Sequence, residues 1–167
     1  MPLPAAEREQ LGNWLDDAYA MESGLVSILQ THADHFDEVM PSIAQRIRQH
    51  VAETQTHASR VEQCLRVLNR PPSAVKSALS SAVATIESAS TALFADHIVK
   101  DVLTDYASEQ FEVACYTALV ATATRLGFPE IARLCGQNLQ EDQAMAAWLL
   151  DRVPAVLARA AAVQRRQ

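Results

Sequence analysis

The sequence is poor in glycine, cysteine and aromatic residues. Its 167 residues include 4 Gly and 3 Cys, and aromatic side chains make up 5% of the chain. Few glycines and aromatics beside many alanines favour helices over a sheet. An odd number of widely spaced cysteines is not typical of a disulfide framework or a zinc motif. We therefore expect the cysteines to be small buried side chains in a reduced, cytoplasmic protein.

Basic charge and long apolar runs are also scarce. Lys and Arg number 14 against 20 Asp and Glu, for a net charge of −6, so no basic patch indicates nucleic-acid binding. No run of about 18 apolar residues is present to span a membrane. The first ten residues have no apolar centre, so we expect no signal peptide. The length suits one domain, 1–167, whose core needs no metal or disulfide to fold.

What the sequence does contain is helical periodicity. Apolar residues at spacings of 3 and 4 predict four long helices and one short one. We expect them over about 4–31, 41–68, 74–88, 96–125 and 129–153, with breaks at "NRPPS" and "LGFP". Pro154 is expected to kink or end the last helix, and the basic segment 155–167 to be a solvated helical tail. The short helix separates two hairpins, which predicts an all-α four-helix bundle with an additional short helix in the crossover.

Each long helix carries an acid on its apolar side, near mid-length. Glu22 and Glu53 are 31 residues apart, and Glu109 and Asp142 are 33 apart, so two matched hairpins would bring them to one level. Carboxylates clustered in a dry core repel one another unless protons, water or cations neutralise them. Carboxylates with imidazole are typical ligands of metal ions in such bundles. The candidate ligands are Glu22, Glu53, His57, Glu109, Glu112, Glu141 and Asp142.

Several of these positions have a second interpretation. Glu112 follows Glu109 by three residues and lies either inward or at the surface. In a metal-free bundle, His57 would pair with Glu53. We interpret His50 as a surface or capping residue, and Tyr116 as a buried ring with a satisfied hydroxyl. The remaining histidines, which we expect to be solvated near helix ends or loops, are His32, His35 and His97.

Four stretches together resemble the YciE/YciF group of bacterial ferritin-like proteins. They are "LDDAYAMESGL", "HVAETQTHASRVEQCL", "EQFEVACYTALVATATRLGFPEIARL" and "LQEDQ", and the resemblance covers about residues 11–153. It implies a five-helix ferritin-like fold, a homodimer, a bacterial cytoplasm and a stress-related role. The chain departs from the ferritin pattern at Thr56, where a histidine would follow Glu53 by three residues.

Three functions remain open at this point. The first is a ferritin-like metal-binding protein with two iron or manganese ions and no assigned catalytic residue. The second is a di-metal oxidase or peroxide-handling enzyme. The third is a metal-free helical dimer with a structural or interaction role. The sequence favours binding over catalysis, and it indicates no substrate.

Overall fold

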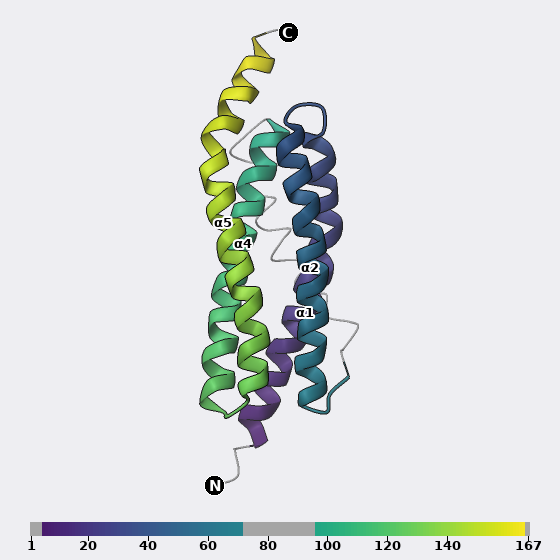
Figure 1. Ribbon diagram of the computed structural model, residues 1–167, viewed down its shortest axis with the longest axis vertical. Helices are drawn as coiled ribbons and strands as arrows, with labels where there is room; N and C mark the ends of the chain where they lie inside the picture. Colours follow the sequence, from purple (N-terminus) through teal and green to yellow (C-terminus); the bar gives the residue numbers. More distant parts are fainter. Residues whose placement is uncertain (1–4, 72–95, 166–167) are drawn as a thin grey trace.

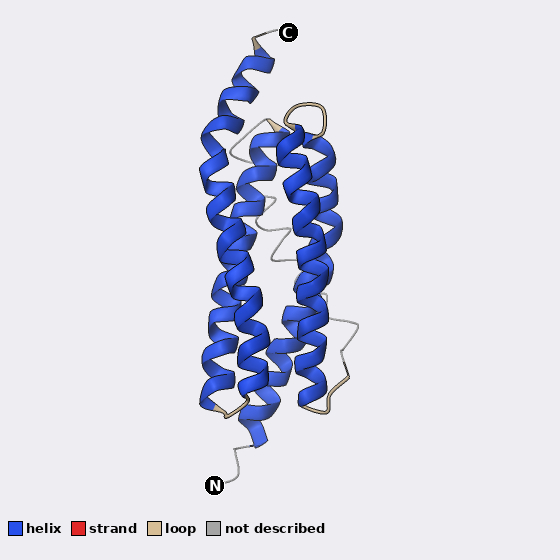
Figure 2. Ribbon diagram, in the orientation of Figure 1, coloured by secondary structure: helices blue, strands red, loops and turns tan. Residues whose placement is uncertain are grey.

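Four long helices make up the described part of the chain. The computed structural model describes residues 5–71 and 96–165. The helices are α1 (Ala5–Phe36), α2 (Pro41–Val67), α4 (His97–Arg125) and α5 (Pro129–Gln164), and no strand occurs among these residues (Figures 1 and 2). The all-α bundle expected from the periodicity is confirmed. The short helix expected at about 74–88 lies outside the described residues.

Local signals explain where the helices begin and turn. Pro41 occupies the first turn of α2, where a missing N–H costs no hydrogen bond. The side chain of Asp96 caps α4 by accepting a hydrogen bond from the backbone N of Ile98 at 3.1 Å. Gly127 has φ of 73° in the tight turn between α4 and α5, a conformation that glycine adopts without strain.

The bundle has the crossover topology that the sequence predicts. α1 packs along α2, and α4 packs along α5, as two hairpins. Contacts from Glu7 to Arg125 and from His32 to Asp105 show that α1 and α4 are antiparallel neighbours. α2 therefore ends at the opposite end of the bundle from the start of α4 (Figure 1). α2 and α4 are diagonal to each other, so their side chains meet only across the centre.

One helix end differs from the prediction, and a second is decided between two expectations. α1 continues through His32 and His35 to Phe36, whereas a break was expected there. α5 does not end at Pro154 but continues to Gln164, in keeping with the helical tail expected after it. The side chain of Val156 is buried beyond the proline, and Arg159 donates a hydrogen bond to the carbonyl of Val39. Packing against the loop between α1 and α2 thus keeps the early part of the expected tail on the bundle. Within the described residues, no helix is long and apolar enough to cross a membrane.

Candidate metal centre

Ionisable side chains occupy the middle of the bundle. Each of the four helices contributes at least one of them from its inward face, and apolar residues such as Leu15, Leu29, Ile47 and Leu149 pack above and below. A carboxylate or imidazole in such a position loses its hydration and requires partners from the protein or from a ligand. The buried polar residues of this region are Glu22, His50, Thr54, His57, Glu109, Glu112, Asn138 and Asp142.

His50 of α2 contacts two carboxylates, one from α4 and one from α2 itself. Its Nε2 lies 2.7 Å from Oε1 of Glu109, and its Nδ1 lies 2.8 Å from Oε2 of Glu53. One ligand atom each from His50, Glu109 and Asp142 falls within 4.8 Å of the others. Burial opposes protonation of His50, but the carboxylates of Glu109 and Glu53 outweigh it and raise the pKa of His50 to about 10. Three helices thus converge on one small volume.

His57 lies further along α2 than His50 and contacts a second set of carboxylates. Its Nδ1 lies 3.3 Å from Oδ1 of Asp142 and 3.6 Å from Oε2 of Glu22. Its Nε2 lies 2.8 Å from Oε2 of Glu141, which also accepts hydrogen bonds from Arg60. Asp142 therefore lies between the two imidazoles and belongs to both sets.

Glu112 and Tyr116 complete the region from α4. Glu112 is 2% exposed. Its burial raises its pKa well above the usual value, and the negative charges of Glu22, Glu109 and Asp142 raise it further. Tyr116 donates a short hydrogen bond to Oε1 of Glu22 and accepts one from Nδ2 of Asn138 at 2.9 Å. The expectation of a buried Tyr116 with a satisfied hydroxyl is confirmed.

Buried acceptor atoms at the centre lack hydrogen-bond partners. They are Oε2 of Glu22, Oε2 of Glu109 and both carboxylate oxygens of Asp142, and Nδ1 of His57 also has none. Burial and the nearby charges of Glu109 and Glu22 raise the pKa of Asp142 to about 8, although the imidazole of His57 opposes this. Carboxylate oxygens and an imidazole nitrogen that lack hydrogen bonds are the donor set that iron, manganese and zinc accept. The residues present therefore fit a bound cation.

The structure brings together five of the seven predicted ligands, Glu22, His57, Glu109, Glu112 and Asp142. The other two lie at the rim. The side chain of Glu53 is 25% exposed and that of Glu141 is 35% exposed. Each binds a central imidazole from outside, Glu53 to His50 and Glu141 to His57. A pair between His57 and Glu53, considered for a metal-free bundle, does not form.

Two interpretations of the histidines and one of Glu112 are wrong. His50 is 1% exposed, not at the surface, because it shares the inward stripe of Ile47, Thr54 and His57. The spacing of 3 and 4 among these residues is the signal that could have identified it. His32 is 6% exposed and bonded to Asp105, so it is not solvated. Glu112 is buried, which excludes its placement at the surface.

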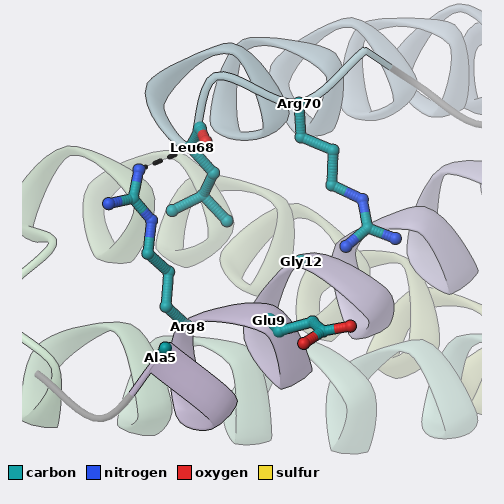
Figure 3. Close-up of a pocket in the computed structure, with 6 residues that line it drawn as sticks. All are labelled: Ala5, Arg8, Glu9, Gly12, Leu68 and Arg70. Carbon is teal, nitrogen blue, oxygen red and sulfur yellow. Dashed lines mark hydrogen bonds between the residues drawn. The ribbon is translucent and has the colours of Figure 1, made fainter.

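A surface pocket lies at the start of α1, away from the bundle centre. It has a volume of about 240 Å³ and is lined by Ala5, Arg8, Glu9, Gly12, Leu68 and Arg70 (Figure 3). Both guanidinium groups already have protein partners. Arg8 donates to the carbonyl of Leu68 at 3.2 Å, and Arg70 donates to Asn13 at 2.8 Å. Arg8 thereby satisfies a carbonyl at the end of α2, which gives it a structural role.

The fold and the central residues define a ferritin-like four-helix bundle with a carboxylate and histidine centre. Residues 6–162 match the family model described as "Domain of unknown function (DUF892)". The chain belongs to that family, as the resemblance to the YciE/YciF group indicates.

Solved structures of similar proteins share the fold over most of the chain. A protein from Xanthomonas campestris is 34% identical, with a TM-score of 0.82 over 95% of this chain and 99% of that one. The E. coli stress protein YciF is 18% identical, with a TM-score of 0.79 over 93% and 99%. The bacterioferritin of Desulfovibrio desulfuricans, described with a diiron site, is 14% identical, with a TM-score of 0.73 over 92% and 83%.

Proposed function

We propose that this protein is a ferritin-like metal-binding protein whose bundle centre holds up to two iron or manganese ions. The observation that carries the proposal is the convergence of His50, Glu109 and Asp142 from three helices, with ligand atoms within 4.8 Å of one another. Oxygens without hydrogen bonds on Glu22, Glu109 and Asp142 support it, because bound cations would satisfy them.

The positions of the two imidazoles suggest how the ligands divide. His50 and Glu109 lie on one side of Asp142, and His57 and Glu22 lie on the other, so Asp142 is placed to contribute to both ions. Glu112 adds a buried carboxylate from α4. Iron or manganese, when bound, would supply positive charge and a change of oxidation state.

Residues at the rim would hold the ligands in place. Glu53 and Glu141 each contact a ring nitrogen of His50 or His57, as carboxylates do around metal-bound histidines. Arg60 donates to both oxygens of Glu141 at 2.9 and 3.0 Å and so fixes its orientation. Glu53 is held similarly by Arg46 at 3.1 Å.

The wider role that we propose is a cytoplasmic homodimer active in bacterial stress. Its support is the family membership and the likeness to a protein described as a stress protein. Sedimentation of the untagged protein tests the dimer, and a mass of one chain would contradict it.

A metal-free structural role is the second candidate. The contacts of His50 with Glu109 and of His57 with Glu141 favour it, because they pair part of the buried charge without a metal. The third, an oxidase or peroxide-handling enzyme, requires the same centre, so the metal content decides whether it is worth testing.

Elemental analysis of the untagged protein, purified without chelator and soaked with iron or manganese, tests the proposal. We expect about one or two ions per chain, because a two-metal centre holds up to two. The Glu109→Ala variant should lose them, while Glu38→Ala, which removes an exposed acid, should keep them. Iron and manganese far below one per chain after soaking would overturn the proposal and favour the metal-free candidate.

A further inference from the structure

The outward surface that α1 and α4 share carries no charge over the middle of the bundle. It consists of the exposed residues of 18–31 in α1 and of 106–124 in α4, and we call it the neutral face. The only charged side chains of these two stretches are Glu22, Glu109 and Glu112, and all three are buried. The other side of the bundle differs. There α2 and α5 hold partly exposed charged side chains, which are Arg46, Glu53, Arg60 and Glu141.

Gly24 and Phe111 lie at about the same level of the neutral face. Glu22 of α1 accepts a hydrogen bond from Tyr116 of α4, which fixes how the two helices are aligned. Because the helices are antiparallel, Gly24 lies two residues from this contact and Phe111 five residues from it, in the same direction. At a rise of about 1.5 Å per residue, the two positions differ by less than about one turn.

Both residues lie on the side of their helix that borders the other helix. Gly24 precedes His35 by three helical turns, and His35 contacts Asp101 of α4 at 2.7 Å. Phe111 follows His97 by about four turns, and the rings of His97 and His35 are 5.2 Å apart. Since Gly24 and Phe111 are also exposed, they lie next to each other on the outer surface of this helix pair.

The two residues give the neutral face a protrusion beside a recess. Phe111 is a large apolar side chain that is 44% exposed. A Cβ added to Gly24 would meet no atom within 4 Å, so the space above this residue is open. Aromatic side chains are enriched at protein interfaces, and charged residues are depleted at their centres. The neutral face has both features.

We propose that the neutral face is the surface on which two copies of this chain meet, with Phe111 of each copy against Gly24 of the other. A two-fold axis parallel to the helices forms both contacts at once, because the two residues are level on neighbouring helices. The inference rests on the homodimer proposed above, to which it adds the interface.

The charge of the chain favours a second copy as the partner. With a net charge of −6, two copies repel each other wherever their acids come together, and the neutral face avoids this. A partner that is recognised by its charge would find no opposite charge on this surface. The face is about 25 Å long and about 20 Å wide, of the order of the roughly 800 Å² that each partner buries in a standard interface.

Sedimentation of the untagged full chain over a range of concentrations tests the interface. Phe111→Glu places like charges opposite each other near the two-fold axis. We expect it to raise the dissociation constant of the dimer by at least about 100-fold. Leu150→Glu is the matched control, because Leu150 is 54% exposed on α5, outside the neutral face. The control should dissociate as the unchanged protein does.

Gly24→Leu tests the recess without adding charge. Leucine favours helix more than glycine does, and the space above Gly24 is open, so the single chain should fold at least as well. The dimer should weaken by at least about 10-fold, because the added side chain occupies the place of Phe111 of the partner copy. Gly136→Leu is the control, since Gly136 lies in α5 and is equally open. Far-ultraviolet circular dichroism establishes folding for each variant.

The possible outcomes separate this inference from the proposed function. If the unchanged protein sediments as one chain, both the homodimer and its interface are overturned. If it is a dimer and Phe111→Glu and Gly24→Leu dissociate no more readily, the interface alone is overturned. A Phe111→Glu protein that stays dimeric but melts at a lower temperature would also overturn it, because the face would then be covered within the chain itself. The metal content of the bundle centre is measured independently of all three results.

Discussion

His50 and Glu109 lie on diagonal helices, and their side chains meet across the centre of the bundle at 2.7 Å. Each is 1% exposed. A buried carboxylate bonded to a buried imidazole is stable only while both partners are present, because either alone would be a desolvated charge. This contact couples the stability of the metal-free protein to the same side chains that we propose as ligands.

Removing His50 should therefore destabilise the metal-free protein strongly. We expect His50→Ala to lower the free energy of unfolding by about 3–5 kcal/mol, the cost of breaking a buried pair. Urea unfolding in chelator measures it. Gln49→Ala, an exposed neighbour on α2, is the control and should change it little. A loss below about 1 kcal/mol for His50→Ala, typical of an exposed pair, would contradict the buried contact.

The metal-free protein should lose stability as the pH rises from about 6 to 9. The pKa of His50 is raised from 6.5 to about 10, so its stabilising charge is fully present below 6.5 and is lost toward 10. The pKa of Asp142 is raised from 3.8 to about 8, so the folded protein also holds this proton over the range where the unfolded chain has lost it. Both groups act in the same direction.

Melting temperatures measured in chelator at pH 6 and pH 9 test this direction. Manganese should reverse the trend, because its ligands must lose their protons before they bind. The Asp142→Asn variant has no such proton to lose and should show a smaller fall. A melting temperature in chelator that rises over this range would contradict the assignment of these protons.

Replacing Asp142 should weaken metal binding at the bundle centre more than replacing an exposed acid of α5. It lies between His50 and His57, so Asp142→Asn would remove a ligand from both ions. We expect manganese affinity to fall by more than about 100-fold, since supporting residues alone are worth about 10–100-fold. Calorimetry measures it, with Asp151→Asn, an exposed position on the same helix, as the control. Equal affinities in the two variants would count against Asp142 as a shared ligand.

Tyr116 should contribute to stability through its hydroxyl. Tyr116→Phe leaves Oε1 of Glu22 and Nδ2 of Asn138 without this partner in a buried site. We expect a loss of about 1–3 kcal/mol in the free energy of unfolding, measured by urea titration. Tyr106→Phe is the control, because Tyr106 is only partly buried on the same helix. Similar losses in both variants would show that the hydroxyl of Tyr116 has no special role.

The sequence by itself determined the helices and much of the centre. The apolar spacing predicted the four long helices, and Pro41 and the "LGFP" turn predicted two of their boundaries. Glu22, Glu109 and Asp142 were found because each interrupts an apolar stripe, a pattern that depends only on helix geometry. These features are local, so they can be predicted without knowing what a helix packs against.

Only the tertiary structure decided which partners the inward side of α2 meets. The spacing of His50 with Ile47, Thr54 and His57 predicts that it faces inward, but periodicity does not say which carboxylate it contacts there. The partner of His50 is Glu109, 59 residues away on a diagonal helix, and that of His32 is Asp105, 73 residues away. Contacts at such separations depend on how the hairpins dock. Docking brought Glu109 to one nitrogen of His50 and left Glu53 at the rim, where it contacts the other nitrogen.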